Sequence, residues 1–476
     1  MIAKLDKKNN PPKKSKKVTK TKAQKTLEKL DYININAAGI DIGSKSHFVA
    51  IPAGRDTEHV REFRTFTNDL IDLVNWLKKC GIKTVAMEST GVYWIPVYDM
   101  LEENGFEVLL VNARHIKNVP GRKTDVLDCQ WIQQLHSYGL LRGSFRPKDK
   151  ILEMRTIMRH REMLIDFSAS HIQRMQKCLF LMNIQLKNVI RDITGATGMN
   201  IIRAIVEGER DPGKLAKFRD PNCKNSEEII KNSLIGNYQA EHIFCLKQAL
   251  EMFDTYSQKI DECNQLIEKI IGALEAQSGN NENKEETEKS VVSRKKRATK
   301  KHGYHFDMHQ ELFRIAGVDL TAIPGTNVQT IARVIAEIGV DMSKWETSKQ
   351  FAAWLGLCPG NKVSGGKKLS GKTAPNANRA AAAFRMGAST LYGDQSALGG
   401  YYRRMRSRLG SPKAITAAAH KMAVILYNML KTGSKYMDSG AEYYEEMYRE
   451  RCVKNLHRKA HVLGYTLVPI AAEAIA

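Results

Sequence analysis

Four acidic residues in the N-terminal third of the chain are arranged as a metal site would need. Asp41 lies at the end of an apolar strand-like segment, GIDIGSK, and Glu88 at the end of another, VAMEST. Asp125 and Asp128 lie three residues apart on a predicted helix, so they share one face of it. Four neighbouring carboxylates repel one another, and divalent cations remove this repulsion. The pattern favours Mg²⁺, or Mn²⁺, because both cations prefer hard oxygen ligands.

Such a site would suit phosphodiester chemistry. Two cations about 4 Å apart can hold both the attacking and the leaving oxygen. Taken singly, Asp41 also suits a turn and Asp125 an N-cap, whereas a buried, unpaired Glu88 would be costly. The string DIGSK also resembles the phosphate loop of actin-like ATPases and sugar kinases. The further Gly-rich phosphate and adenosine loops of such enzymes are not found downstream, so the nuclease interpretation ranks higher.

The charge of the chain indicates a polyanionic partner. The 476 residues include 74 Lys and Arg against 51 Asp and Glu, a formal net charge of +23. Neutralising phosphates releases counterions, so nucleic acid is the expected partner. A membrane surface is the rival, but no amphipathic anchor, lipidation signal or long apolar run is found. The Lys-rich N-terminus lacks an apolar signal region, and the eight scattered cysteines show no CxxC pair. We therefore expect a cytoplasmic, nucleoid-associated protein.

Apolar periodicity predicts an α/β domain at the N-terminal end. Residues 37–54 predict two strands joined by a Gly turn, and residues 62–68 predict a third. Helices and strands then alternate, which indicates a mixed sheet. The helix expected within GVYWIPVYDMLEENG has Ser89 or Thr90 as its candidate N-cap.

The rest of the chain is expected to be mainly helical. Residues 148–195 and 226–275 have helical spacing and should pair as an elongated hairpin, with a solvated helical bundle as the alternative. A polar, charged segment with almost no apolar residues then indicates a linker. The expected division is a disordered basic tail (1–34), the α/β domain (35–147), a helical, coiled-coil region (148–275), a charged linker (276–305), a mainly α C-terminal domain (306–432) and a C-terminal extension (433–476).

Several strings of the sequence resemble the DEDD transposases. They are GIDIGSKSHFVA, AMESTGVYW and GRKTDVLDCQWI followed by GLLRGSF, in that order. This is the insertion-sequence family numbered one hundred and ten, which includes the Piv-type DNA invertases. IPGTNVQTIARVIAEIG and FAAWLGLCPGNKVSGGK resemble the family's C-terminal transposase domain. The likeness covers most of residues 37–430, and the Lys-rich tail and the charged linker look like additions.

The resemblance implies a RuvC-like, ribonuclease H-type fold for the α/β domain. It implies that Asp41, Glu88, Asp125 and Asp128 match the family's four acids and bind Mg²⁺. It also implies a nucleophilic serine, because the family's Ser-Gly string falls on Ser364 here. Relatives use a structured noncoding bridge RNA that pairs with donor and target DNA. They act as homodimers that join into tetramers and recombine through a Holliday junction.

The expected nucleophile, Ser364, lies in the Gly- and Lys-rich string KVSGGKKLSGK. A serine hydroxyl needs activation, which the metal and the acids of the first domain could supply. Gly365 and Gly366 would let a DNA backbone approach closely. Taken alone, the string is typical of a flexible surface loop, and Ser370 is a rival nucleophile in it. The lysines that could neutralise phosphate charge are Lys362, Lys367, Lys368 and Lys372.

Other residues are expected to contact nucleic acid on weaker grounds. Lys123 and Thr124 precede the acid pair and are candidates for contacts with the scissile strand or RNA. Arg155, Arg159 and Arg379 lie on predicted helices with basic faces. A solvated, charged helix face is the alternative for these arginines.

The sequence thus predicts a transposase that cuts and rejoins DNA by Mg-assisted serine attack, with a structured noncoding RNA as guide. A metal-dependent, structure-specific DNA nuclease that uses water is the enzyme alternative, and its cleavage would survive loss of the Ser364 hydroxyl. A catalytically inactive nucleic-acid-binding module is a third hypothesis, under which Asp41→Ala changes neither DNA breakage nor metal binding. Specific binding of ATP would favour an actin-like kinase instead.

Overall fold

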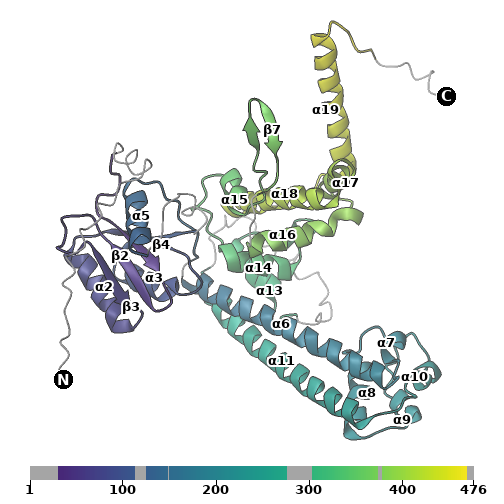
Figure 1. Cartoon of the computed structure of the whole chain (residues 1–476). Coiled ribbons are helices and arrows are strands. Elements are labelled where there is room, and N and C mark those ends of the chain that lie inside the picture. Colours follow the sequence, from purple (N-terminus) through teal and green to yellow (C-terminus); the bar gives the residue numbers. More distant parts are fainter. Residues whose placement is uncertain (1–30, 113–124, 148, 276–302, 374–377, 469–476) are drawn as a thin grey trace, which may run out of the picture. The chain divides into compact units, whose positions relative to one another are not determined.

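The computed structural model describes residues 31–112, 125–147, 149–275, 303–373 and 378–468. Four residues within these ranges are described by their backbone alone: Asp125, Val126, Lys362 and Lys368. The chain forms two compact units, which divide between Arg146 and Pro147 (Figure 1). In the part of the chain that is described, no helix is long and apolar enough to cross a membrane.

The first unit is built on a five-stranded mixed sheet of order β3-β2-β1-β4-β5. β1 pairs antiparallel with β2, and β2 with β3, whereas β1, β4 and β5 run parallel. The predicted α/β domain with a mixed sheet is therefore confirmed. The strands are β1 (Ala37–Ile42), β2 (Ser46–Ala50), β3 (Val60–Arg64), β4 (Thr84–Glu88) and β5 (Glu107–Val111). The third strand ends before residue 68 because Thr67 already begins a helix.

Helices cover both faces of this sheet. On one face, α2 (Thr67–Lys79) and α3 (Trp94–Glu103) pack against the side chains of alternate strand residues, and Ile40 and Met87 lie at the centre of this core. On the other face, α5 (Asp125–Ser137) packs against β1 and β4, and Ile132 and Ala86 belong to one buried apolar cluster there. Residues preceding the sheet also lie against α5, since the backbone nitrogens of Ile33 and Asn34 donate to Ser137.

The start of α3 differs from the prediction. Its N-cap is Tyr93, and neither Ser89 nor Thr90 caps the helix. The backbone nitrogen of Ser89 instead donates to the carbonyl of Val111, which continues the pairing of β4 with β5 by one residue. Because the chain is still bound to the sheet at Ser89, the helix begins five residues later.

A glycine in β1 sets the distance between the sheet and α5. A Cβ atom at Gly39 would lie 2.2 Å from the backbone nitrogen of Gln133 and 2.5 Å from the carbonyl oxygen of Cys129. Both neighbours are backbone atoms of α5, so no change of side-chain rotamer could relieve the overlap. The close packing of α5 on β1 therefore requires glycine at this position.

The second unit begins with a long helical hairpin. α6 (Asp149–Leu181) and α11 (Ala240–Gly272) lie side by side (Figure 1) and bury Leu164, Ile260 and Cys263 between them. The hairpin agrees with the pairing expected of these two segments, and a coiled coil remains a prediction. Four short helices with their own apolar core lie at the end of the hairpin: α7 (Leu186–Val189), α8 (Ala196–Glu207), α9 (Pro212–Ala216) and α10 (Glu227–Ser233).

The C-terminal part of this unit is mainly helical. α15, α16 and α17 pack on α18, and α19 packs on α17. A two-stranded hairpin, β6 (Lys362–Ser364) and β7 (Lys367–Ser370), lies between α15 and α16 in the sequence. The helices are α13 (Met308–Ala316), α14 (Val328–Ile338), α15 (Ser348–Trp354), α16 (Arg379–Ser389), α17 (Ala397–Leu409), α18 (Ser411–Thr432) and α19 (Gly440–Val462), with short 3₁₀ turns at Leu320–Ala322 and Leu391–Gly393.

Ion pairs join α6 to the C-terminal helices. The guanidinium of Arg159 donates from Nε and Nη2 to the two carboxylate oxygens of Glu337, both at 2.7 Å. On the next turn of α6, Glu162 binds Arg333, and Arg379 donates to it at 3.2 Å. Glu337 is buried, and removal of its bidentate partner would leave a buried carboxylate poorly paired, which is costly.

A buried histidine makes the first unit sensitive to acid. His136 of α5 is 4% exposed, and its Nε2 lies 2.9 Å from Oγ1 of Thr84. Burial lowers the pKa of His136 to about 4. The neutral imidazole is thus favoured in the folded state. Its contribution to stability is present above the unfolded pKa of about 6.5 and is lost as the pH falls towards 4.

We predict that acidification from pH 7 to pH 5 costs the first unit on the order of 2 kcal/mol through His136. His136→Gln removes the titrating group, so its loss of stability over this range should be smaller by that amount. Amide hydrogen exchange of peptides from β4 and α5, corrected for the intrinsic exchange rate, measures the effect within the full chain. Equal acid sensitivity in both proteins would contradict the prediction.

We also predict that Gly39→Ala lowers the free energy of unfolding of the first unit by about 3 kcal/mol, because the new Cβ overlaps the backbone of α5. Hydrogen exchange of peptides from β1 and α5 measures it. Gly272→Ala is the matched control: this helical glycine has no heavy atom within 4 Å of the missing Cβ, and alanine should leave stability unchanged or raise it. Unaltered exchange in Gly39→Ala would contradict the packing described above.

Candidate functional site

Two of the predicted acids lie at one edge of the sheet. In the parallel pair β1 and β4, Ile40 is in register with Met87. The residues that follow are Asp41 and Glu88, so these carboxylates project from adjacent strands at the same level. Both are half-buried. Asp41 lies two residues beyond Gly39, and side chains alternate along a strand, so it is on the face covered by α5.

The helix α5 brings a third acid to this place. Asp128 is half-buried on α5, and its neighbour Cys129 is buried below it. Burial raises the pKa of the Cys129 thiol to about 12, and the negative charges of Asp41 and then of Asp128 add to this shift. Asp128 directly precedes Cys129, whose carbonyl oxygen abuts Gly39 of β1, so this part of α5 lies against the strand that carries Asp41. Asp125 is the first residue of α5, and its side chain is outside those that the structure describes.

A hydroxyl group orients Glu88. Oγ1 of Thr90 donates to Oε1 of Glu88 at 3.2 Å. Sequence reasoning considered Thr90 only as a helix cap and missed this contact. The signal was present, because a Thr two residues after a strand-end acid can return its hydroxyl to that carboxylate. Thr90 thus belongs to the surroundings of the predicted site.

The chemistry of these donors fits a hard divalent cation. Asp41, Glu88 and Asp128 offer only carboxylate oxygens, which Mg²⁺ and Mn²⁺ prefer. Among the residues that the structure describes, no three His, Cys, Asp or Glu side chains are close enough to hold an ion. That search does not include the side chain of Asp125, so the ligand set of four acids stays a prediction.

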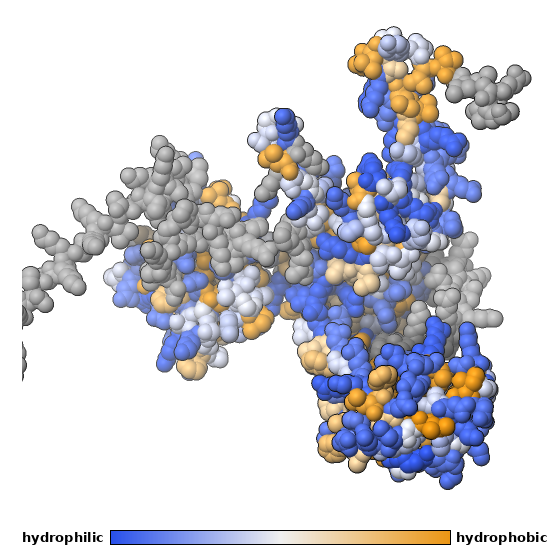
Figure 2. Space-filling view, turned by 45° about the vertical axis from the view of Figure 1, so that its right-hand side comes forward, coloured by the Kyte–Doolittle hydropathy of each residue, from blue (hydrophilic) through white to orange (hydrophobic). Residues whose placement is uncertain are grey.

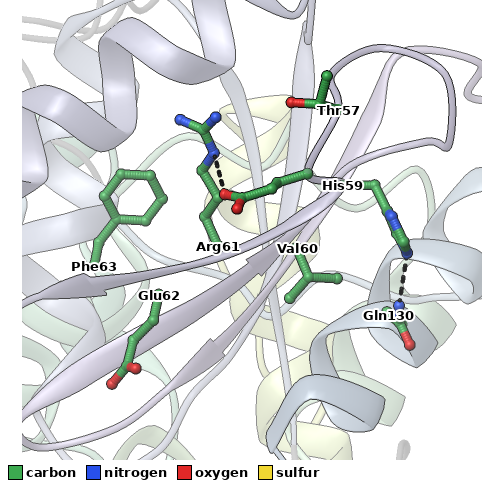
Figure 3. Close-up of a pocket in the computed structure, with 8 residues that line it drawn as sticks. Thr57, His59, Val60, Arg61, Glu62, Phe63 and Gln130 are labelled. Atoms are coloured by element: carbon green, nitrogen blue, oxygen red, sulfur yellow. Dashed lines mark hydrogen bonds and ion pairs between the residues drawn. The ribbon is translucent and has the colours of Figure 1, made fainter. Parts of the chain in front are cut away.

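A surface depression of about 790 Å³ lies beside the edge strand β3 (Figure 3). Two polar pairs are found in it: Glu58 with Arg61 at 3.5 Å, and His59 with Gln130 at 3.1 Å. None of the residues predicted to do chemistry lines it. Its lining residues are Thr57, Glu58, His59, Val60, Arg61, Glu62, Phe63 and Gln130.

Ser364 lies at the tip of the β6–β7 hairpin, where a loop was expected. It pairs with Lys367 across Gly365 and Gly366, whose φ angles are +54° and +74°. Two successive residues with positive φ define the type I′ turn that fits the twist of a two-residue hairpin, and glycine adopts it without strain. Ser364 is exposed, so the hydroxyl can reach a substrate in solution.

The rival serine has a different setting. Ser370 ends β7 at the opposite end of the hairpin, is half-buried, and accepts a hydrogen bond from the backbone nitrogen of Lys372 at 3.3 Å. Exposure and position therefore favour Ser364 over Ser370.

The predicted nucleic-acid contacts fall into three groups. Lys367 and Lys372 are exposed on or beside the hairpin. Arg155, Arg159 and Arg379 instead lie against internal carboxylates: the first two against Glu337, and Arg379 against Glu162. Lys123 and Thr124 lie outside the described residues, as do the side chains of Lys362 and Lys368. All of these contacts stay predictions, and for the three arginines the internal carboxylates compete with phosphate.

Comparison with protein families agrees with these features. A model of the transposase family DEDD_Tnp_IS110 matches residues 38–184, which include all four acids. A model of the Transposase IS116/IS110/IS902 family matches residues 318–402, which include the serine hairpin. DEDD transposases are typically metal-dependent. No curated protein matches the chain. The two matches show that the chain belongs to the IS110 family and is a DNA transposase.

Proposed function

We propose that this transposase cuts and rejoins DNA through a phosphoserine intermediate at Ser364, with Mg²⁺ held by Asp41, Glu88, Asp125 and Asp128. The observation that supports it best is that Asp41 and Glu88 stand at the same level at the ends of two adjacent parallel strands, β1 and β4, beside the helix that carries Asp125 and Asp128. In a protein whose substrate is DNA, half-buried acids at the ends of two adjacent parallel strands suit metal binding better than core packing. The mixed sheet around Asp41 supports a RuvC-like domain.

The proposed step exchanges one phosphodiester for another. Oγ of Ser364 attacks a DNA phosphorus, the Oγ–P bond forms, and the bond from phosphorus to the leaving sugar oxygen breaks. The serine proton passes to a base or to water, and the leaving oxygen takes up a proton. Because bond types are conserved, a second sugar hydroxyl can reverse the step and join a new strand. When bound, Mg²⁺ would supply positive charge that stabilises the oxygens around phosphorus.

The hairpin suits this task. Apart from the glycine itself and its two chain neighbours, no heavy atom lies within 4 Å of where a Cβ would be at Gly365 or Gly366, so the turn leaves space for a DNA backbone next to Ser364. Lys367 and Lys372 are exposed nearby and can neutralise phosphate charge. These residues bind and orient the strand, and Ser364 provides the attacking oxygen.

A guide RNA would select the DNA sequences that are cut and joined. A structured noncoding RNA would pair with donor and target DNA, because pairing reads sequence while the protein reads backbone shape. The net charge of +23 suits a protein that holds several polyanions. A homodimer that assembles into a tetramer would hold both DNA partners.

The first test is a search for a covalent adduct. Purified protein, Mg²⁺, the noncoding RNA flanking the gene and labelled DNA with the joined ends of the element are mixed, then denatured. We expect a protein–DNA adduct that is lost in Ser364→Ala and in Asp41→Ala but kept in Ser370→Ala. DNA cleavage without an adduct, unaffected by Ser364→Ala, would show hydrolysis by water instead. An adduct that depends on Ser370 would overturn the assignment of Ser364.

A second test uses the contact between Thr90 and Glu88. Thr90→Val removes the hydroxyl, so the Mg²⁺ concentration that gives half-maximal adduct formation should rise about tenfold or more. Thr90→Ser keeps a hydroxyl and should restore the wild-type value. If both variants require the same Mg²⁺ concentration as the wild type, Thr90 does not position Glu88 for a metal.

A further inference from the structure

The last described helix, α19, forms an arm with a fixed base. At the base, Arg404 of α17 stacks on Tyr448, with its Cζ 3.3 Å from the ring centroid, and Tyr401 meets Tyr444 edge-on at 6.1 Å. The helices approach closely there, since a Cβ at Gly400 would lie 3.2 Å from the ring of Tyr444. These contacts hold the direction of the arm relative to α17.

Beyond the base, the arm is exposed. α19 has no buried residue, and Figure 2 shows its outer part standing clear of the other helices of its unit. A solitary helix that buries no apolar stripe gains little from tertiary packing. Selection for stability of the fold therefore does not account for the side chains of its outer half.

Those side chains carry concentrated positive charge. Residues 449–461 include five Lys and Arg and a single acid, Glu450. Arg451, Lys454 and Arg458 follow one another at spacings of three and four residues, so they form one stripe, which His461 extends. All four are exposed. Along the helix axis, the stripe spans about 10 Å from Arg451 to Arg458 and about 15 Å when His461 is included.

Helix stability does not explain this stripe. Like charges three and four residues apart destabilise a helix. The helix dipole favours cations only in the last turn, and Arg451 lies well before it. Glu450 is one turn before Lys454, yet among the described residues neither Arg451, Lys454 nor Arg458 forms an ion pair. Arg159, Arg203 and Arg379 of the same unit do have carboxylate partners.

We propose that the stripe of Arg451, Lys454 and Arg458 on α19 is a docking surface for the phosphate backbone of duplex DNA, outside the site of strand cleavage. The duplex carries one negative charge per ~1.7 Å of its axis, so a stripe of this length faces several phosphates. Membership of the transposase family supplies DNA as the partner of matching charge. The inference does not depend on the serine chemistry or on a guide RNA.

The test compares two charge-reversed pairs on the same helix in the full-length protein. The stripe variant, Arg451→Glu/Arg458→Glu, reverses two charges within the stripe. The control variant, Arg449→Glu/Lys459→Glu, changes the net charge by the same amount on other faces of the helix. Binding of a labelled 30-base-pair duplex is measured by fluorescence anisotropy at several NaCl concentrations. With two phosphate contacts removed, the slope of log affinity against log salt should become shallower by about 2 in the stripe variant, and by clearly less in the control.

Two further measurements make the result decisive. Arg451→Gln/Arg458→Gln removes the charges without adding acids and should reproduce the shallower slope, which separates lost contacts from new repulsion. A structured RNA of similar length is measured in parallel. Equal effects of the stripe and control pairs, no effect of the glutamine pair, or a change confined to RNA would each overturn the proposal. Because only binding is measured, the result is independent of whether Ser364 is the nucleophile.

Discussion

The closeness of α5 to β1 is the constraint on which the candidate metal site depends. At Gly39 the backbone of α5 occupies the space that any side chain would need. The same strand carries Asp41 two residues later, on the same face. On the helix, Cys129, whose carbonyl abuts Gly39, directly follows Asp128. A missing Cβ thereby sets how near the part of α5 that carries Asp128 comes to the strand that carries Asp41. With a larger residue at position 39, α5 would have to move outwards and take its acids with it.

Glu88 is positioned in a different way. Glu88 depends on the parallel pairing of β4 with β1, which a buried apolar core fixes in register. Thr90 and the continued pairing of Ser89 with β5 then hold the chain at that edge. The site therefore combines one helix whose distance is set by a glycine with two strands whose level is set by hydrogen bonding.

Local features of the sequence were sufficient for the strands, the long helices and the position of the acids. The apolar strings before Asp41 and Glu88 and the three-residue spacing of the Asp pair are visible without a structure. The Gly-Gly hairpin was also visible in principle, since two glycines between short β-prone runs indicate a two-residue turn. The surrounding lysines and serines, however, are typical of loops and favour that interpretation from the sequence alone. The partners of Arg159 could not be found in this way: Glu337 is 178 residues away, and no local pattern links them.

The pairing of Arg159 with Glu337 also shows that the net charge of +23 does not by itself identify the residues that bind nucleic acid. Positive residues on α6 look like a nucleic-acid surface in the sequence, yet Arg159 and its neighbour Arg155 lie on a buried carboxylate that would be left uncompensated without them. The same residue type on α19 has neither a carboxylate partner among the described residues nor a packing role. An arginine that pairs with a carboxylate of the protein is not free to bind phosphate. The positive residues that can bind nucleic acid are therefore the arginines and lysines without such a partner. In the C-terminal unit, the hairpin that carries Ser364 and the outer half of α19 meet this condition better than the helix with the most conspicuous basic pattern.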